Sequence, residues 1–66
     1  MRNYTALVVD YAYAESTFGF VCQADDIDHA EEQAKDAYPN CDVVWIEEGT
    51  DVEGAMVRYW DDFVLQ

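Results

Sequence analysis

Carboxylates recur every three to four residues along one segment of this chain. The segment is Asp25–Tyr38, and its acidic positions on one side are Asp25, Asp28, Glu31, Glu32 and Asp36. In a helix, such positions are neighbours on one face, about 5–6 Å apart, and each like-charged pair costs about 0.2–0.5 kcal/mol. Only Lys35 supplies an opposite charge within the segment. The spacing therefore predicts a helix that places acid next to acid on its outer face.

A second group of acids brackets the turn predicted after the strand at residues 42–48. Its members are Glu47, Glu48, Asp51 and Glu53. Residues on the same face of a strand repeat at about 6–7 Å, which, like the helix spacing, is similar in scale to the spacing of phosphates along a nucleic-acid strand. We therefore expect both acidic groups to replace phosphates opposite Lys and Arg of a partner. The alternative is that they are ordinary solvated surface.

The charge balance supports a basic partner. The chain has 66 residues, with 15 Asp and Glu against 3 Lys and Arg, so its formal net charge is −12. With 52% hydrophobic residues it is too apolar for a disordered acidic tail. The chain has no basic patch to meet phosphates, which excludes direct nucleic-acid binding, and an anionic membrane surface would repel it. A basic nucleic-acid-binding protein remains as the expected partner.

Catalytic and metal-binding patterns are missing from the sequence. His29 is the single histidine, there is no glycine-rich phosphate loop, and the acids of the helix lack the D-x-D-x-D-G pattern of a calcium loop. Cys22 and Cys41 form no CxxC motif, so we expect reduced thiols, with a disulfide between them as the alternative. We expect no enzyme activity, no cofactor and no specific metal site.

The first half of the chain reads as a hairpin followed by a helix. Tyr4–Asp10 and Thr17–Ala24 alternate in hydrophobicity, and the short link between them predicts an antiparallel pair. The segment at residues 11–16 either extends the first strand or forms the connection. Asp25 or Asp26 can cap the helix, an apolar stripe of Ile27, Ala30, Ala34 and Tyr38 faces the core, and Pro39 ends it.

The second half contains one clear strand and one ambiguous segment. Asp42–Glu48 reads as a third strand, followed by a turn at Gly49. Ala55–Trp60 can pair back as a fourth strand, or it can belong to an amphipathic helix. Its β-branched and aromatic content favours the strand. We therefore predict one α+β domain over residues 1–66, in the order ββαββ, with a C-terminal helix as the alternative.

A single helix covers only one face of such a sheet. The other face would carry Tyr4, Val8, Val43 and Trp45 without a cover, and exposed apolar patches of this kind often mark an interface. The alternative is that the C-terminal segment folds over this face. The start of the chain lacks a signal-peptide pattern, and no apolar run reaches the length of a membrane span, so we expect a cytoplasmic protein.

Three acidic stretches carry a resemblance to a known class of proteins. With its acidic helix (DDIDHAEEQAKD) and acidic turns (EEGTDVE, WDD), the chain resembles the DNA-mimic proteins of bacteriophages, which include anti-restriction and anti-CRISPR inhibitors. It is most similar in size and character to inhibitors of type I effector complexes. The resemblance covers the whole chain in composition but includes no specific motif. It implies a stoichiometric inhibitor without a cofactor that blocks duplex or PAM recognition by an effector subunit in an infected host cell. We expect a monomer or a weak homodimer.

Three other functions remain open at this level. An immunity-type inhibitor could plug the active site of a basic nuclease or toxin, using a few carboxylates focused on one centre. A halophilic domain could be acidic for solvation alone. A small acidic subunit could dock through an open sheet face, with Tyr4, Val8 and Trp45 at the contact.

Overall fold

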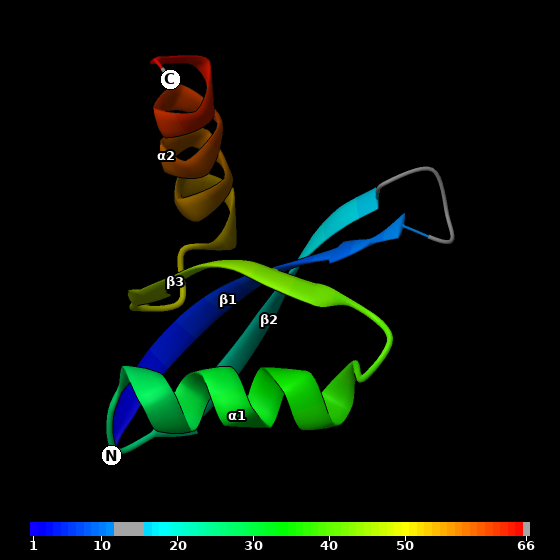
Figure 1. The fold of residues 1–66 in the computed structure, drawn as a ribbon. Helices are drawn as coiled ribbons and strands as arrows, with labels where there is room; N and C mark the ends of the chain where they lie inside the picture. The colour runs from blue at the N-terminus through cyan, green and yellow to red at the C-terminus, as the bar shows by residue number, and fades with distance from the viewer. Residues whose placement is uncertain (12–15, 66) are drawn as a thin grey trace.

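The computed structural model describes residues 1–11 and 16–65, with side chains described as far as residue 62. Our expectation for the link between the first two strands falls on residues 12–15, which lie outside the described residues. The elements in chain order are β1 (Arg2–Asp10), β2 (Ser16–Ala24), α1 (Ile27–Ala37), β3 (Asp42–Glu48) and α2 (Val52–Leu65) (Figure 1). The α+β class is confirmed, with three strands and two helices in place of four strands and one helix.

The first strand forms the centre of the sheet. The strand order is β2-β1-β3, and β1 pairs antiparallel with both neighbours. Residues 4–9 of β1 are all buried, so both faces of this strand are covered. The apolar run at this position is typical of a strand that is enclosed on two sides. The pairing with β3 shifts register between Leu7 and Val8.

Helix α1 covers the sheet face that carries Tyr4, Ala6 and Val8. Ala30 of the helix packs with Tyr4 and Ala24, and Ala34 is also fully buried. Small residues at these positions let the helix backbone approach the sheet closely. Phe18, Phe20 and Cys22 pair in register with Val8, Ala6 and Tyr4, which confirms that they share one face.

The two ends of α1 agree with the capping signals in the sequence. The Asp26 side chain accepts a hydrogen bond of 2.8 Å from the His29 backbone N–H, so Asp26 is the N-cap. At the other end, the ring of Tyr38 meets Phe18 and Phe20 edge-on, with centroids 4.8 and 5.8 Å away. The apolar stripe is narrower than expected, because Ile27 in the first turn remains 51% exposed.

The C-terminal segment is a helix, so the favoured prediction of a fourth strand over residues 55–60 is wrong. The Asp51 side chain accepts a hydrogen bond of 2.9 Å from the Gly54 N–H and caps the new helix. Gly49, at φ +114°, makes the sharp turn that precedes it. Ala55 is fully buried and Val52 and Met56 are half-buried. Helical spacing of apolar residues thus prevails over local strand propensity.

The start of helix α2 meets the sheet face opposite to α1, and the helix then rises away from the sheet (Figure 1). Gly19 of β2 sits directly beneath Val52, and Trp45 of β3 meets Tyr59 at a centroid distance of 6.0 Å. The expectation that Tyr4 and Val8 lie on an uncovered face is wrong, because they are 3% and 0% exposed on the α1 side. The alternative, in which the C-terminal segment folds over the second face, is what the structure shows.

Substitution of Gly19 by Ala tests the docking of α2 on the sheet. A Cβ atom there would overlap the Val52 side chain, and overpacking of this kind costs about 1–3 kcal/mol. We expect Gly19→Ala to lower the free energy of unfolding in urea by about this amount, although Gly→Ala in a strand is otherwise favourable. The double variant Gly19→Ala/Val52→Ala should recover most of the loss. A gain in stability for the single variant would contradict this packing.

Candidate functional site

The three basic residues of the chain all form ion pairs within it. Arg2 lies 3.4 Å from Glu48, Lys35 lies 2.9 Å from Glu31, and Arg58 binds Glu47. Arg58 also lies 3.9 Å from Asp51, so each of the three side chains is already engaged with a carboxylate of the chain. The acidic surface is a property of the folded protein and not only of its composition.

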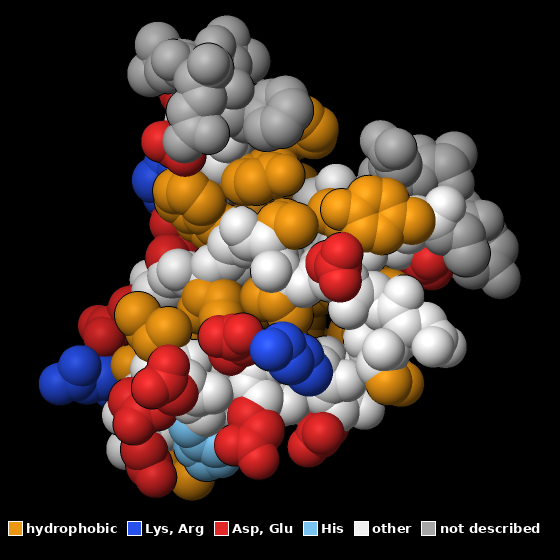
Figure 2. Space-filling model, viewed as in Figure 1, with side chains coloured by type: hydrophobic (Ala, Val, Ile, Leu, Met, Phe, Trp, Pro, Cys, Tyr) orange, Lys and Arg blue, Asp and Glu red, His pale blue; other side chains and the backbone are white. Residues whose placement is uncertain are grey.

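The outer face of α1 carries a row of exposed carboxylates. Asp28, Glu32 and Asp36 are exposed and follow one another at intervals of four residues, which corresponds to steps of about 6 Å along the axis. Within the part of the chain that the structure describes, no ion-pair or hydrogen-bond partner faces these three carboxylates. We call these residues the α1 acidic face. Figure 2 shows acidic side chains gathered over this helix.

The start of α1 lies beside the end of β3. Arg2 pairs in register with Ala24, just before the helix, and Tyr4 pairs with Glu48, so both segments reach the same end of the sheet. Asp25 belongs to this end, and its carboxylate is 4.0 Å from Nδ1 of His29. Asp25 and Glu48, one from each predicted acidic group, therefore lie toward the same end of the sheet, whereas Asp36 lies at the far end of α1.

Glu47 makes contacts within the fold that the sequence did not predict. Its carboxylate accepts hydrogen bonds from Arg58, through Nε at 2.8 Å and through Nη2, and from Nε1 of Trp45 at 3.3 Å. Its side chain is only 20% exposed. The hydrogen bonds from Arg58 lower the pKa of Glu47, and their effect outweighs burial, which acts in the opposite direction. Through Arg58, Glu47 connects α2 to β3, and its carboxylate is already engaged in these hydrogen bonds.

Some of the remaining predicted residues bind partners within the chain, and others are exposed without such a partner among the described residues. Glu31 and Glu48 are paired with Lys35 and Arg2, and Asp51 caps α2 with Arg58 at 3.9 Å. Glu53 is exposed in the first turn of α2, where a negative charge also favours the helix dipole. Of the two predicted groups, Asp28, Glu32, Asp36 and Glu53 therefore offer carboxylates without an internal partner among the described residues.

The pKa values of both thiols are raised in the folded protein. Cys22 and Cys41 are free cysteines. Burial raises the pKa of Cys22, and burial together with Asp10 and Asp42 raises the pKa of Cys41, which weakens both as nucleophiles. Over residues 1–11 and 16–62, no three His, Cys, Asp or Glu side chains come together as metal ligands.

Comparisons with known proteins identify no relative. No protein-family model matches the chain, and neither the curated proteins nor the solved structures contain a match. Among the described elements, neither helix has the length and apolar character needed to cross a bilayer.

The variant Glu47→Gln tests whether this residue stabilises the fold. We expect it to lower the free energy of unfolding at neutral pH by about 1 kcal/mol, because the charge-assisted hydrogen bonds from Arg58 are weakened. Glu31→Gln is the matched control, since it removes the same charge from an exposed pair on α1 and should change stability by less than about 0.5 kcal/mol. Equal effects of the two variants would assign Glu47 to the open surface.

The effect of Glu47→Gln should also depend on pH in a defined direction. The pKa of Glu47 is lower in the folded state than in the unfolded chain, so the ionised residue stabilises the fold above its unfolded pKa, about 4.3. This stabilisation is lost as the pH falls through the lower folded value. Unfolding curves of the protein and of Glu47→Gln should therefore converge in acid. A difference that persists unchanged in acid would rule out the ionised carboxylate as its cause.

Proposed function

We propose that this protein is a stoichiometric inhibitor that imitates the phosphate charge of duplex DNA. The observation that supports the proposal is the α1 acidic face, whose three carboxylates stand in a regular row and form no ion pair with any described residue. An isolated solvated helix would gain from mixed charges on its surface. A row of like charges instead suits a groove lined by Lys and Arg.

The helix scaffold suits this function physically. The Asp26 cap and the buried Ala30 and Ala34 fix α1 against the sheet, so its carboxylates are presented with little loss of freedom on binding. A net charge of −12 attracts a basic target over long range and speeds the encounter. The long-range attraction and the faster encounter both weaken with added salt, as DNA binding does.

The target that this surface fits is a basic protein that recognises duplex DNA. We place the inhibitor on the duplex- or PAM-binding surface of a CRISPR or restriction effector, in the cytoplasm of an infected host cell if a phage encodes it. It needs no cofactor and performs no reaction. Self-repulsion at −12 favours a monomer or a weak homodimer.

One observation favours a second candidate function. At the end of the sheet where α1 begins and β3 ends, Asp25, Asp28 and Glu48 come from neighbouring elements. A focused group of this kind suits an immunity-type inhibitor that plugs the active site of a basic nuclease or toxin. Charge reversals confined to this end would abolish such binding, whereas a duplex mimic would also depend on Asp36 at the far end.

The partner can be identified by capture under competition. The purified protein is used as bait in bacterial lysate at low and high salt, with and without duplex DNA, and the captured complex is then assayed for duplex binding. Mimicry requires that both duplex DNA and salt release the captured complex, and that the protein blocks its DNA binding in a one-to-one ratio. Capture that resists both competitors, or no specific capture, would contradict the proposal.

Charge reversal on α1 tests the site directly. Glu32→Lys/Asp36→Lys should weaken binding to the captured target at least 100-fold, because it places repulsive charges opposite Lys and Arg. Its fold should remain intact, since the change removes like-charge repulsion along the helix. The single variants Glu32→Lys and Asp42→Lys form a matched pair, because Asp42 pairs with Val9 and so lies on the face opposite to α1. Equal losses in this pair would indicate a net-charge effect without a defined site.

Folding in dilute buffer separates mimicry from halophilic adaptation. We expect the protein to show its full helix and strand signal by circular dichroism at about 10 mM ionic strength, where screening extends to about 30 Å. The protein should stay folded because the buried strand β1 and the three internal ion pairs stabilise it without added salt. Unfolding in dilute buffer that salt reverses would support the halophilic interpretation instead.

A further inference from the structure

Helix α2 presents apolar side chains on its outward face. Val57 and Trp60 are 56% and 48% exposed, and Ala55, on the inner face, is fully buried. Their spacing of three residues places Val57 and Trp60 on one side of the helix, with Glu53 four residues before Val57 and Asp61 four residues after it. The outward face of α2 is therefore an apolar centre with carboxylates at both ends.

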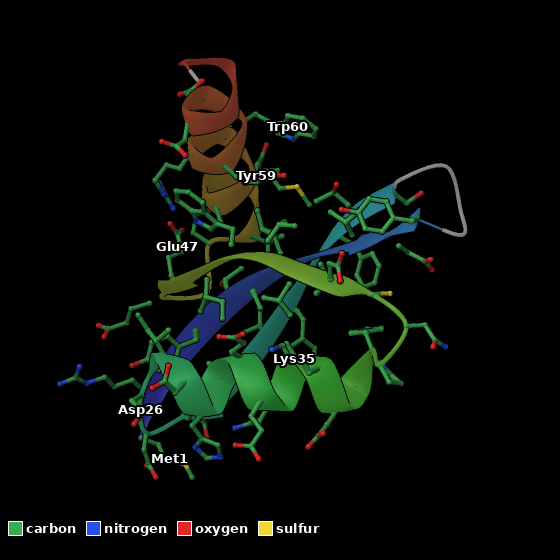
Figure 3. All side chains as sticks on the ribbon, in the orientation of Figure 1. Met1, Asp26, Lys35, Glu47, Tyr59 and Trp60 are labelled. Atoms are coloured by element: carbon green, nitrogen blue, oxygen red, sulfur yellow. The ribbon has the colours of Figure 1, made fainter. Side chains whose placement is uncertain are left out.

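The ring of Trp60 is supported by a row of aromatic contacts that starts in the sheet. Its centroid lies 5.3 Å from that of Tyr59, which in turn lies 6.0 Å from that of Trp45 on β3. Trp45 also donates its indole N–H to Glu47, the residue that binds Arg58 of α2. Figure 3 shows Trp60 projecting from α2 beyond Tyr59. This support restricts the ring before any partner arrives, which reduces the entropy lost on binding.

The charge around this face restricts what can cover it. Glu53, Asp61 and Asp62 are exposed on the same helix, and the chain as a whole carries −12. A second copy would bring these carboxylates against their own kind, and an anionic membrane surface or a nucleic acid would be repelled in the same way. A protein surface that combines an apolar pocket with Lys or Arg at its rim complements both the exposed Val57 and Trp60 and the carboxylates around them.

We propose that Val57 and Trp60 form a second contact with the basic partner, inserting into an apolar pocket whose rim of Lys or Arg meets Glu53 and Asp61. The basic character of the partner rests on the proposed function. The contact itself is on a different element from the α1 acidic face and works through burial of apolar surface. Exposed aromatic residues of this kind often dominate binding energy at protein interfaces.

Two synthetic peptides separate this contact from charge alone. One is an amphipathic helical peptide of Leu and Lys, and the other is an oligolysine of equal charge; both are labelled for binding measurements by fluorescence polarisation. We expect Trp60→Ala to weaken binding of the Leu/Lys peptide roughly tenfold and to leave oligolysine binding unchanged. Ile27→Ala, which truncates a similarly exposed apolar residue on α1, should affect neither peptide.

A second variant guards against a folding defect. Val57→Ala removes an exposed side chain that takes part in no ring contact, and it should weaken Leu/Lys peptide binding about threefold. Urea unfolding is measured for each variant, and chemical-shift changes in ¹H–¹⁵N spectra should map to α2 when the Leu/Lys peptide is added. Unchanged binding of this peptide to both variants, or shifts elsewhere, would overturn the proposal.

The same measurements distinguish failure of this proposal from failure of the proposed function. Glu32→Lys/Asp36→Lys should reduce oligolysine binding, and a lack of effect there would count against the α1 acidic face alone. Trp60-dependent self-association in sedimentation experiments would assign the α2 face to a second copy and overturn the basic partner. Trp60-dependent binding to zwitterionic lipid vesicles would overturn it in favour of a membrane surface.

Discussion

Repulsion among fifteen carboxylates is the constraint to which this small fold is adapted. The chain has only three Lys and Arg residues, and two of them join separate elements. Arg2 links the start of β1 to the end of β3 and Arg58 holds α2 to β3, whereas Lys35 pairs within α1. On the outer surface of α1, Lys35 pairs with Glu31, and no ion pair of the described residues reaches Asp28, Glu32 or Asp36. The small number of cations therefore bears both on how the elements are held together and on why Asp28, Glu32 and Asp36 keep their charge exposed.

Apolar burial must supply most of the stability that electrostatics opposes. A chain of this length buries a limited fraction of its surface. Here much of the buried apolar surface belongs to the central strand, which is covered on both sides. Fully buried alanines bring α1 close to one face, while on the other Gly19 leaves room for Val52. The aromatic residues extend this core outward, since Trp45 and Tyr59 connect β3 to α2 and carry Trp60 to the surface.

Local patterns predicted the elements whose signals agree with one another. Alternation gave the hairpin, and Asp26 and Pro39 bounded α1. The C-terminal segment was misjudged because its Val, Tyr and Trp residues favour a strand locally, while its helix depends on the Asp51 cap and on packing against a distant strand. The internal contacts of Glu47 were missed for the same reason. The partner of Glu47, Arg58, lies on α2, and the contact forms in a structure where residues 52–65 are helical. Interpreting this segment as a strand gave no indication of the contact.

The two surfaces should respond differently to the ionic environment. Carboxylates on α1 act at long range and lose strength as salt screens them, over about 8 Å at physiological ionic strength. Contacts of Val57 and Trp60 act only on close approach and are insensitive to screening, because they depend on removing apolar surface from water. A binder that combines them would be guided to its target by charge and retained by apolar contact. The affinity that remains in high salt would then measure the contribution of α2. The slope of the logarithm of affinity against the logarithm of salt concentration would measure the contribution of α1.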